Sequence, residues 1–334
     1  MNYKLLFICV MCASFILTVL ISKWLIPVLK SRKMGQKILE IGPRWHKNKE
    51  GTPTMGGLAF IMASLITGCA AAVYIYKSDG LSAVFPFIFT MALGLAGGLI
   101  GCIDDAAKLR NKRNDGLTPP QKFLLQLIAA SLYLAAMAIF CDTNTSMHIP
   151  FTDITIELGI SYYIIALILI CGIMNSVNLT DGIDGLASSV TLVVGAFFAL
   201  AGFMTENALP DGSLISLGGI MFGSCAGFLV YNLHPARVFM GDTGSIFLGG
   251  LVIGGAFMMN DPLLVVIFGL VYIIETASVM LQVTYFKLTG GKRLFKMAPI
   301  HHHFEKCGWG ENKIVIVFTL ITACLCALSL FAGR

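Results

Sequence analysis

The sequence is divided into runs of about twenty apolar residues, and this feature constrains the fold more than any other. A helix that crosses a bilayer needs about 20 predominantly apolar residues. Charged residues make up only 12% of the 334-residue chain, and apolar residues make up 57%, whereas soluble domains carry about 25% charged residues. A soluble enzyme is therefore excluded. We predict an all-α integral membrane protein with about ten transmembrane helices, near residues 5-29, 55-76, 84-103, 122-141, 161-177, 185-204, 213-232, 244-258, 262-286 and 313-332.

Basic residues predict which way these helices cross the membrane. The loops 30-54, 104-121 and 287-312, together with Arg237, hold seventeen of the 23 Lys and Arg. Cytoplasmic loops carry the excess of positive charge, so these loops are expected on the cytoplasmic side and both termini on the extracytoplasmic side. The first run is too long for a signal-peptide core and precedes its basic cluster, which favours a retained anchor. The net charge of +5 is thus a topology signal, and no nucleic-acid partner is expected.

Glycines recur at four-residue spacing within the apolar runs, as in Gly94 with Gly98 and Gly250 with Gly254. Such spacing lets membrane helices pack closely, and none of these glycines belongs to a phosphate-binding loop that follows a strand. The chain shows neither a repeat nor a linker. We therefore predict one polytopic membrane domain over residues 1-334.

Acidic residues gather at the predicted cytoplasmic ends of the spans. Asp104 and Asp105 end the third span, Asp242 follows the seventh, and the connection 175-184 contains Asn178, Asp181 and Asp184. Acids in or beside spans are costly and usually functional. The active site is therefore expected at the cytoplasmic face.

The residue types in this cluster favour a hard divalent cation. Carboxylate and amide oxygens without thiolates suit Mg²⁺ or Mn²⁺. Asp104 and Asp105 are adjacent and point about 100° apart on a helix, so one can bind metal while the other acts as base or nucleophile. Which of them takes which role stays open.

Two further features allow more than one interpretation. His301, His302 and His303 are consecutive and cannot converge on one zinc ion, so contact with solvent or phosphate is favoured. Glu275 lies inside the ninth predicted span, where both core pairing and an intramembrane functional role are open.

Several motifs occur in order between about residues 44 and 312: Thr52-Pro-Thr-Met-Gly-Gly57, Asp104-Asp105, Asn178-Leu-Thr-Asp-Gly-Ile-Asp184, Asn232-Leu-His-Pro-Ala236, Phe239-Met-Gly-Asp-Thr-Gly-Ser245 and Pro299-Ile-His-His-His-Phe-Glu305. Together they closely resemble the phospho-N-acetylmuramoyl-pentapeptide-transferase family of bacterial polyprenyl-phosphate phosphosugar transferases. The acidic motifs resemble the wider superfamily, and the histidine motif resembles the muramoyl-pentapeptide branch.

The resemblance implies a reaction and its partners. Phospho-MurNAc-pentapeptide would pass from UDP-MurNAc-pentapeptide to undecaprenyl phosphate, giving lipid I and UMP with Mg²⁺ in peptidoglycan biosynthesis. The implied setting is the bacterial cytoplasmic (inner) membrane, with membrane lipid around a homodimer.

The resemblance also implies residue roles. Asp242 resembles the Mg²⁺ ligand, Asp105 the base or nucleophile with Asp104 beside it, and His301 a member of the catalytic cluster. Phe239 and Gln282 resemble nucleobase contacts. The other candidate substrate-binding residues are Lys49, Lys108, Lys112, Lys122, Asn178, Asp181, Asp184, Asn232, His302 and His303.

Three alternatives remain at this point. A sister enzyme that transfers GlcNAc-1-phosphate to the same lipid is disfavoured by the histidine motif. A cation-coupled transporter would bind its substrate near the bilayer midplane, whereas only Glu275 is clearly at that depth. A scaffold protein would not need the carboxylates.

Overall fold

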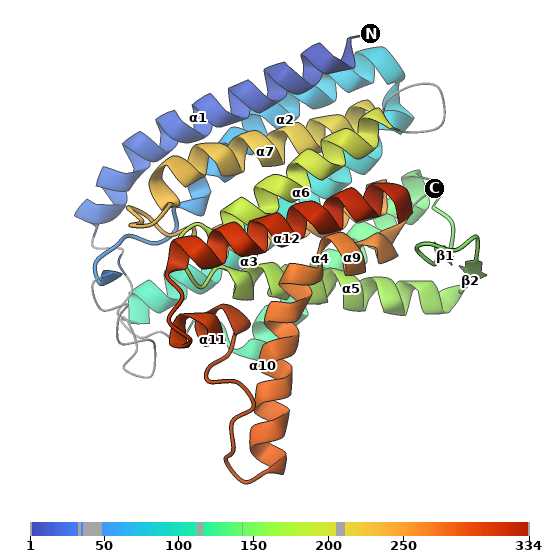
Figure 1. Ribbon diagram of the computed structural model, residues 1–334. Coiled ribbons are helices and arrows are strands. Elements are labelled where there is room, and N and C mark those ends of the chain that lie inside the picture. Colours follow the sequence, from blue (N-terminus) through green and yellow to red (C-terminus); the bar gives the residue numbers. More distant parts are fainter. Residues whose placement is uncertain are drawn as a thin grey trace.

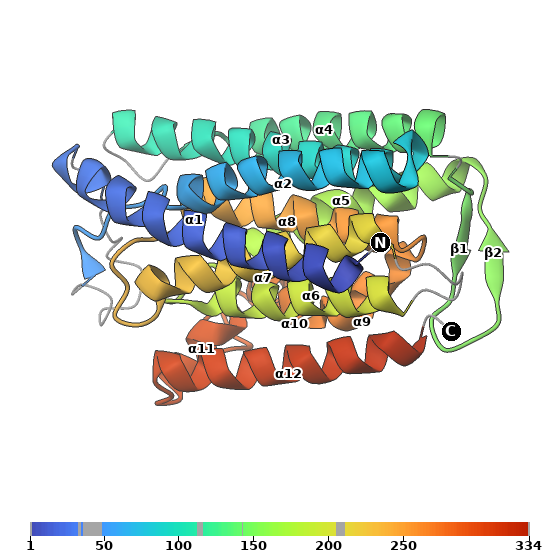
Figure 2. The same ribbon diagram turned by 90° about the horizontal axis from the view of Figure 1, so that it is seen from above.

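The computed structural model describes residues 2–32, 35, 49–111, 116–141, 143–204 and 211–332. Long helices dominate it (Figure 1), and most of them run side by side along one direction (Figure 2). The elements of the first half are α1 (Tyr3–Ser31), α2 (Gly57–Asp79), α3 (Leu81–Asn111), α4 (Pro119–Phe140), β1 (Ser146–His148), β2 (Thr155–Glu157) and α5 (Ile160–Thr180). Those of the second half are α6 (Leu186–Phe203), α7 (Gly212–Asn232), α8 (Gly241–Met258), η2 (Pro262–Leu264), α9 (Val265–Phe268), α10 (Leu270–Leu288), α11 (Ile300–Lys306) and α12 (Glu311–Ala332).

The helices confirm the prediction of an all-α multipass membrane protein. Within the described ranges, nine helices are long and apolar enough to cross a membrane, and a tenth crossing results if the bent pair Pro262–Phe268 and Leu270–Leu288 forms one span. The start of α1 and the end of α12 lie toward the end of the bundle that carries β1 and β2 (Figure 1). The side of the membrane that this end faces stays a prediction.

The predicted span 262-286 is not one continuous helix, which corrects the sequence interpretation. The chain bends by 79° between α9 and α10, and Gly269 lies at the bend. A Cβ at Gly269 would lie 2.5 Å from the Val265 carbonyl oxygen, so this geometry depends on glycine. As a result, α10 projects away from the bundle (Figure 1).

The glycine spacing has the predicted effect, most clearly between α3 and α8. A Cβ on Gly250 of α8 would lie 2.8 Å from the Cα of Gly94 in α3, and one on Gly254 would meet Thr90. These small residues let the two backbones approach each other closely. Although α8 has the lowest mean hydropathy of the nine straight span candidates, 89% of its apolar window is buried, because it lies inside the bundle.

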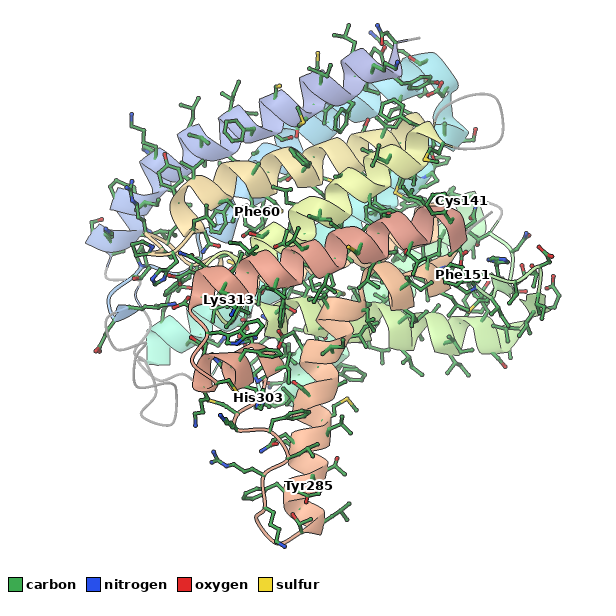
Figure 3. All side chains as sticks on the ribbon, viewed as in Figure 1. Phe60, Cys141, Phe151, Tyr285, His303 and Lys313 are labelled. Atoms are coloured by element: carbon green, nitrogen blue, oxygen red, sulfur yellow. The ribbon has the colours of Figure 1, made fainter. Side chains whose placement is uncertain are left out.

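A short hairpin of two strands and one short helix were not predicted. β1 and β2 form an antiparallel hairpin in which Met147 pairs with Ile156, and α11 lies within the loop 287-312. Strands of three residues are too short to give a recognisable alternation of apolar and polar residues. Side chains of the hairpin end, among them Phe151, lie far from His303 of α11 (Figure 3).

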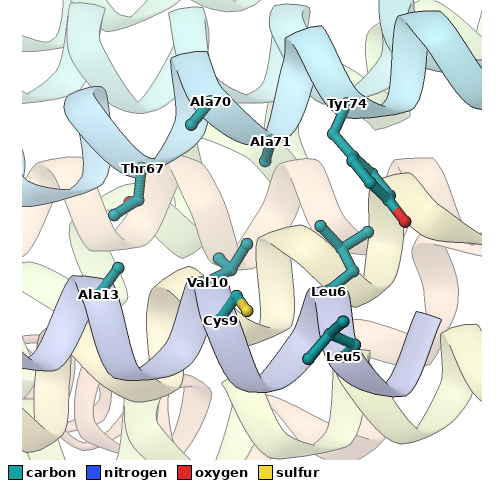
Figure 4. Close-up of a pocket in the computed structure, with 9 residues that line it drawn as sticks. All are labelled: Leu5, Leu6, Cys9, Val10, Ala13, Thr67, Ala70, Ala71 and Tyr74. Carbon is teal, nitrogen blue, oxygen red and sulfur yellow. The ribbon is translucent and has the colours of Figure 1, made fainter. Parts of the chain in front are cut away.

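An apolar pocket of about 310 Å³ lies between α1 and α2 (Figure 4). Thr67 and Tyr74 bring the polar side chains of its lining, and the Thr67 hydroxyl already donates to the Ala63 carbonyl. This pocket suits apolar groups such as lipid tails. It does not offer the charges that a phosphosugar would need.

Candidate active site

The close approach of α3 and α8 brings their acidic ends together. A Cβ at Gly101 in α3 would overlap the backbone of Asp242 and Thr243 at the start of α8, so only glycine permits this contact. One turn further along α3, the Asp105 carboxylate accepts hydrogen bonds from the Thr243 N–H (2.9 Å), the Thr243 hydroxyl (2.7 Å) and the Asp242 N–H (3.3 Å). Asp105 therefore caps the N-terminus of α8, whose free N–H groups favour a negative charge.

The Asp242 side chain is the centre of the charge network. Its Oδ2 accepts from Lys108 Nζ at 2.9 Å and from Lys122 Nζ at 2.8 Å, and its Oδ1 accepts from Asn178 Nδ2 at 2.9 Å. Asn178 is held in turn because its Oδ1 accepts from Lys122 and its Nδ2 also donates to Ser245. Helices α3, α4, α5 and α8 thus meet at one carboxylate.

Asp104 completes a group of three carboxylates. It forms a 2.6 Å ion pair with Lys108 and accepts from the Leu117 N–H at 2.7 Å. Ligand oxygens of Asp104, Asp105 and Asp242 lie within 4.8 Å of one another. Three carboxylates without a thiolate fit a hard divalent cation.

A second cluster lies at the start of α12. The Lys49 ammonium contacts Asp184 Oδ1 and Glu311 Oε2, each at 2.7 Å. His234 Nδ1 lies 2.9 Å from the other Asp184 oxygen. Although Asp184, His234 and Glu311 also have the spacing of metal ligands, the Lys49 ammonium supplies the positive charge between the two carboxylates.

Two cavities meet at this end of the bundle. The first has a volume of about 240 Å³. The second, of about 700 Å³, lies beside α4 and includes Asp104, Lys122 and the apolar Pro119 and Phe123. Lys108 and Asp242 line both. We call the first cavity the inner cavity and the second the outer cavity. The predicted residues that line the inner cavity are Lys49, Lys108, Asn178, Asp181, Asp184, Asn232, Phe239 and Asp242.

The wall of the inner cavity is held in shape by backbone contacts. The Phe239 N–H donates to the Pro53 carbonyl, and its own carbonyl accepts from the Gly56 N–H, both at 2.8 Å. The Asn232 amide donates to the Val238 carbonyl at 3.0 Å. The motif 52-57 is thus a backbone support for the Phe239 segment, and Asn232 fixes the turn that precedes it.

Asp181 has an unusual electrostatic setting in this cavity. It directly follows α5, outside the spanning segment. Burial raises the pKa of its carboxyl well above its usual range, and the nearby Asp242, Asp105 and Asp184 raise it further. Asp181 is therefore protonated more readily than an ordinary aspartate, and a protonated carboxyl can donate a hydrogen bond to a ligand.

Glu275 pairs with the first of the three histidines. His301 is fully buried, and its Nδ1 lies 3.0 Å from Glu275 Oε2. In the described part of the chain, His301 Nε2 has no hydrogen-bond partner, and a Cβ at Gly182 would overlap it. His301 therefore packs against the turn that carries Asp181 and Asp184.

The remaining predicted residues lie outside the two cavities. His302 Nδ1 lies 2.6 Å from Glu305, and His303 Nδ1 accepts from the Lys296 N–H. Gln282 Oε1 accepts from the Leu294 and Phe295 N–H groups, and its side chain lines a separate pocket of about 360 Å³ on α10. Lys112 lies outside the described residues.

Sequence reasoning missed His234, Thr243, Ser245 and Glu311. The first three stand inside the motifs 232-236 and 239-245, within three residues of Asn232 or Asp242. Glu311 carries no such signal, because it stands six residues beyond the histidine motif and reaches Lys49 only through the fold.

The sequence matches the Glycosyl transferase family 4 over residues 87–260 and the Phospho-N-acetylmuramoyl-pentapeptide-transferase signature 1 over residues 49–61. Similar proteins bear the name phospho-N-acetylmuramoyl-pentapeptide-transferase. One from Clostridium acetobutylicum is 46% identical over 319 residues, which are 95% of each chain. One from Staphylococcus aureus is 44% identical over 91% of this chain and 92% of its own. One from Staphylococcus carnosus is 41% identical over 96% of this chain and 97% of its own.

Proposed function

Because this chain belongs to the phospho-N-acetylmuramoyl-pentapeptide-transferase family, it makes lipid I in peptidoglycan biosynthesis, and we propose how its residues carry out the transfer. The donor is UDP-MurNAc-pentapeptide, the acceptor is undecaprenyl phosphate, and the second product is UMP. The observation that carries this proposal is that Lys108 and Asp242 line both cavities. A nucleotide-sugar in one cavity and a lipid phosphate in the other would meet at these two side chains.

The inner cavity suits the water-soluble donor. Lys49 and Lys108 offer positive charge to its diphosphate, Asp181 and Asn178 offer hydrogen bonds, and Phe239 offers an aromatic face to the nucleobase. Gln282 lies in another pocket. Its predicted contact with the nucleobase would therefore need α10 or its loop to move.

The outer cavity suits the lipid acceptor. Its wall combines Lys122 with Pro119 and Phe123, and the Phe123 side chain is exposed where lipid would surround the helix. An anionic headgroup could contact Lys122 while the polyprenyl chain stays among apolar side chains. Lys108 and Lys122 would reduce the repulsion between the two anionic substrates.

The transfer itself exchanges one phosphorus–oxygen bond for another. An oxygen of the acceptor phosphate attacks the phosphorus that carries MurNAc, and the bond from that phosphorus to the UMP oxygen breaks with its electron pair leaving on UMP. Asp104 and Asp242, which both line the outer cavity, are then the carboxylates that would face the acceptor. Asp105 is not among the residues that line either cavity, which favours a role in positioning Asp242 over direct attack.

Mg²⁺ is proposed as the cofactor, with Asp242 as its main ligand and Asp104 beside it. The three carboxylates within 4.8 Å support this assignment. When bound, the ion would stabilise the negative charge that develops on the phosphates.

We also propose the bacterial inner membrane as the location and a homodimer as the assembly. Large apolar side chains such as Leu20 and Trp24 are exposed on the outer face of α1. Lipid or a second copy would cover this face.

The direct test measures UMP release by purified protein in detergent. We expect release with UDP-MurNAc-pentapeptide and undecaprenyl phosphate, and loss of that release when Mg²⁺ is removed. Turnover of UDP-GlcNAc in place of the muramoyl donor would contradict the assigned substrate. Release that is unchanged without any divalent ion would contradict the assigned cofactor.

A further inference from the structure

Glu311, the first residue of α12, joins segments that are far apart in sequence. Its Oε2 accepts from Lys49 Nζ at 2.7 Å and from the Asp184 N–H at 3.0 Å. Its Oε1 lies 3.6 Å from His234 Nδ1. Because only 9% of its side chain is exposed, water competes weakly for its contacts with Lys49 and Asp184.

The segments that meet at Glu311 form much of the wall of the inner cavity. Lys49 and Asp184 line it, and the other Asp184 oxygen accepts from His234 and from the Ala236 N–H at 3.0 Å. Glu311 itself is not among the lining residues. Its carboxylate therefore touches the residues that would touch the donor, and it acts through them.

The turn before α12 holds Glu311 in place. Trp309 packs against Phe304 of α11 with ring centroids 4.9 Å apart, and Lys313 Nζ lies 4.2 Å from the centre of the Trp309 ring. The position of Glu311 is thus set by α11 and α12 together. A carboxylate on this support can fix the flexible Lys49 side chain, which would otherwise have many rotamers.

We propose that Glu311 is a positioning residue for the donor: it fixes the Lys49 ammonium and the turn 181-184 in the arrangement that binds the nucleotide-sugar. This inference rests on the proposed function of the inner cavity. It assigns to Glu311 an effect on donor affinity and none on the acceptor site, where Lys122 and Asp104 lie.

The first experiment compares Glu311→Ala and Glu311→Gln with the wild-type protein in UMP release. We expect the KM for UDP-MurNAc-pentapeptide to rise about tenfold in Glu311→Ala, which corresponds to about 1.4 kcal/mol. We expect a smaller rise in Glu311→Gln, because the amide oxygen can still accept from the Asp184 N–H. The kcat and the KM for undecaprenyl phosphate should stay within about twofold. A fall in kcat with an unchanged donor KM would overturn the proposal.

A double-mutant cycle separates positioning from a general effect on folding. In a Lys49→Met background, Glu311→Gln should raise the donor KM much less than it does alone, because effects through a shared partner are not additive. Full additivity of the two changes would overturn the assignment to Lys49.

Two controls distinguish a wrong role for Glu311 from a wrong proposed function. Glu157→Gln, at the exposed hairpin, removes a carboxylate at the other end of the bundle and should leave every kinetic constant unchanged. Calorimetric titration with UMP should give weaker binding in Glu311→Gln than in wild type. Wild-type protein that releases no UMP would refute the proposed function, whereas active wild type with equal UMP affinity in Glu311→Gln would refute only the inference about Glu311.

Discussion

The two ends of the helix bundle both carry charged groups, but they arrange them differently. At the active-site end, Asp242 accepts from two lysines and one amide, and Lys108 is shared among several carboxylates. At the hairpin end, His148 Nδ1 lies 3.0 Å from Asp261, and its Nε2 lies 2.6 Å from the Thr152 carbonyl oxygen. In the first group each lysine contacts more than one acceptor, whereas in the second each ring nitrogen of His148 has a single acceptor.

This difference indicates what each arrangement does. Both ring nitrogens of His148 face acceptors, and only the protonated imidazole can donate to both. The pair therefore links the hairpin to the start of η2, and its role is structural. The shared lysines of the active-site end are expected to contribute to substrate binding and less to stability.

The largest expected effect is at Asp242. Asp242→Asn should lower UMP release by about 10²- to 10³-fold, the usual loss when a main electrostatic group of an active site is removed. The protein should still fold, since Asn can keep some of the hydrogen bonds. Thermal unfolding in detergent and UMP release, measured on the same sample, check both statements. Near-normal UMP release by Asp242→Asn would contradict the claim that the Asp242 network serves catalysis, whereas the His148 pair is structural.

A methyl group at Gly101 tests the contact between α3 and α8. Gly101→Ala would overlap the backbone of Asp242 and Thr243, so the helices would have to move apart, at a cost of about 1–3 kcal/mol in the free energy of unfolding. We expect a lower unfolding temperature together with lower activity. The matched control is Gly172→Ala, because a Cβ at Gly172 meets no atom within 4 Å. Equal stability of the two variants would contradict the contact.

A smaller effect is expected at Thr243, whose hydroxyl donates to Asp105 at 2.7 Å. Thr243→Val should reduce stability by about 1–2 kcal/mol, because one donor to a buried carboxylate is lost while the backbone donors remain. Thr243→Ser should retain most of the wild-type stability and activity. If Val and Ser behave alike, Asp105 does not depend on this hydroxyl.

The smallest effect is a pH dependence at the hairpin end. The hydrogen bond to Asp261 raises the pKa of His148, with a further contribution from Asp153. Burial raises the pKa of Asp261, whereas its hydrogen bond with His148 lowers that pKa; the net change is a rise. The stabilisation from His148 is therefore complete below about pH 6.5 and is lost as the pH rises through its higher folded-state pKa. Deprotonation of Asp261, whose folded-state pKa is also raised, likewise lowers stability as the pH rises, but in a lower pH range.

Hydrogen exchange of the hairpin amides at pH 6 and pH 9 measures this effect. Protection should fall with rising pH by a few tenths of a kcal/mol, as for a partly exposed ion pair, and His148→Gln should remove the pH dependence. UMP release by His148→Gln at a fixed pH should equal that of wild type. A pH dependence that persists in the variant would show that another group is responsible.

The sequence predicted the parts of the fold that depend on composition and spacing. Apolar runs predicted the spans, and the glycine spacing at 94, 98, 250 and 254 predicted close helix packing, which the structure places between α3 and α8. The bend at Gly269 was missed, because apolar character continues through it. The single-domain organisation and the orientation of the termini stay predictions.

The candidate site was predicted less completely, for physical reasons. Asp242 and the cavity residues stand in recognisable motifs, whereas the link from Glu311 to Lys49 crosses most of the chain and cannot be inferred from local spacing. The capping of α8 by Asp105 also depends on tertiary contact. Sequence therefore selects the candidate groups, and the fold determines which of them face the cavities.

We propose that the group of Asp104, Asp105 and Asp242 holds a divalent cation through Asp242. Binding of Mn²⁺ to the purified protein, followed by electron paramagnetic resonance with Mg²⁺ as competitor, tests this claim without requiring turnover. We predict one displaceable ion per chain in wild type and in Glu157→Gln, and much weaker binding in Asp242→Asn. Binding of equal affinity in Asp242→Asn would contradict the claim.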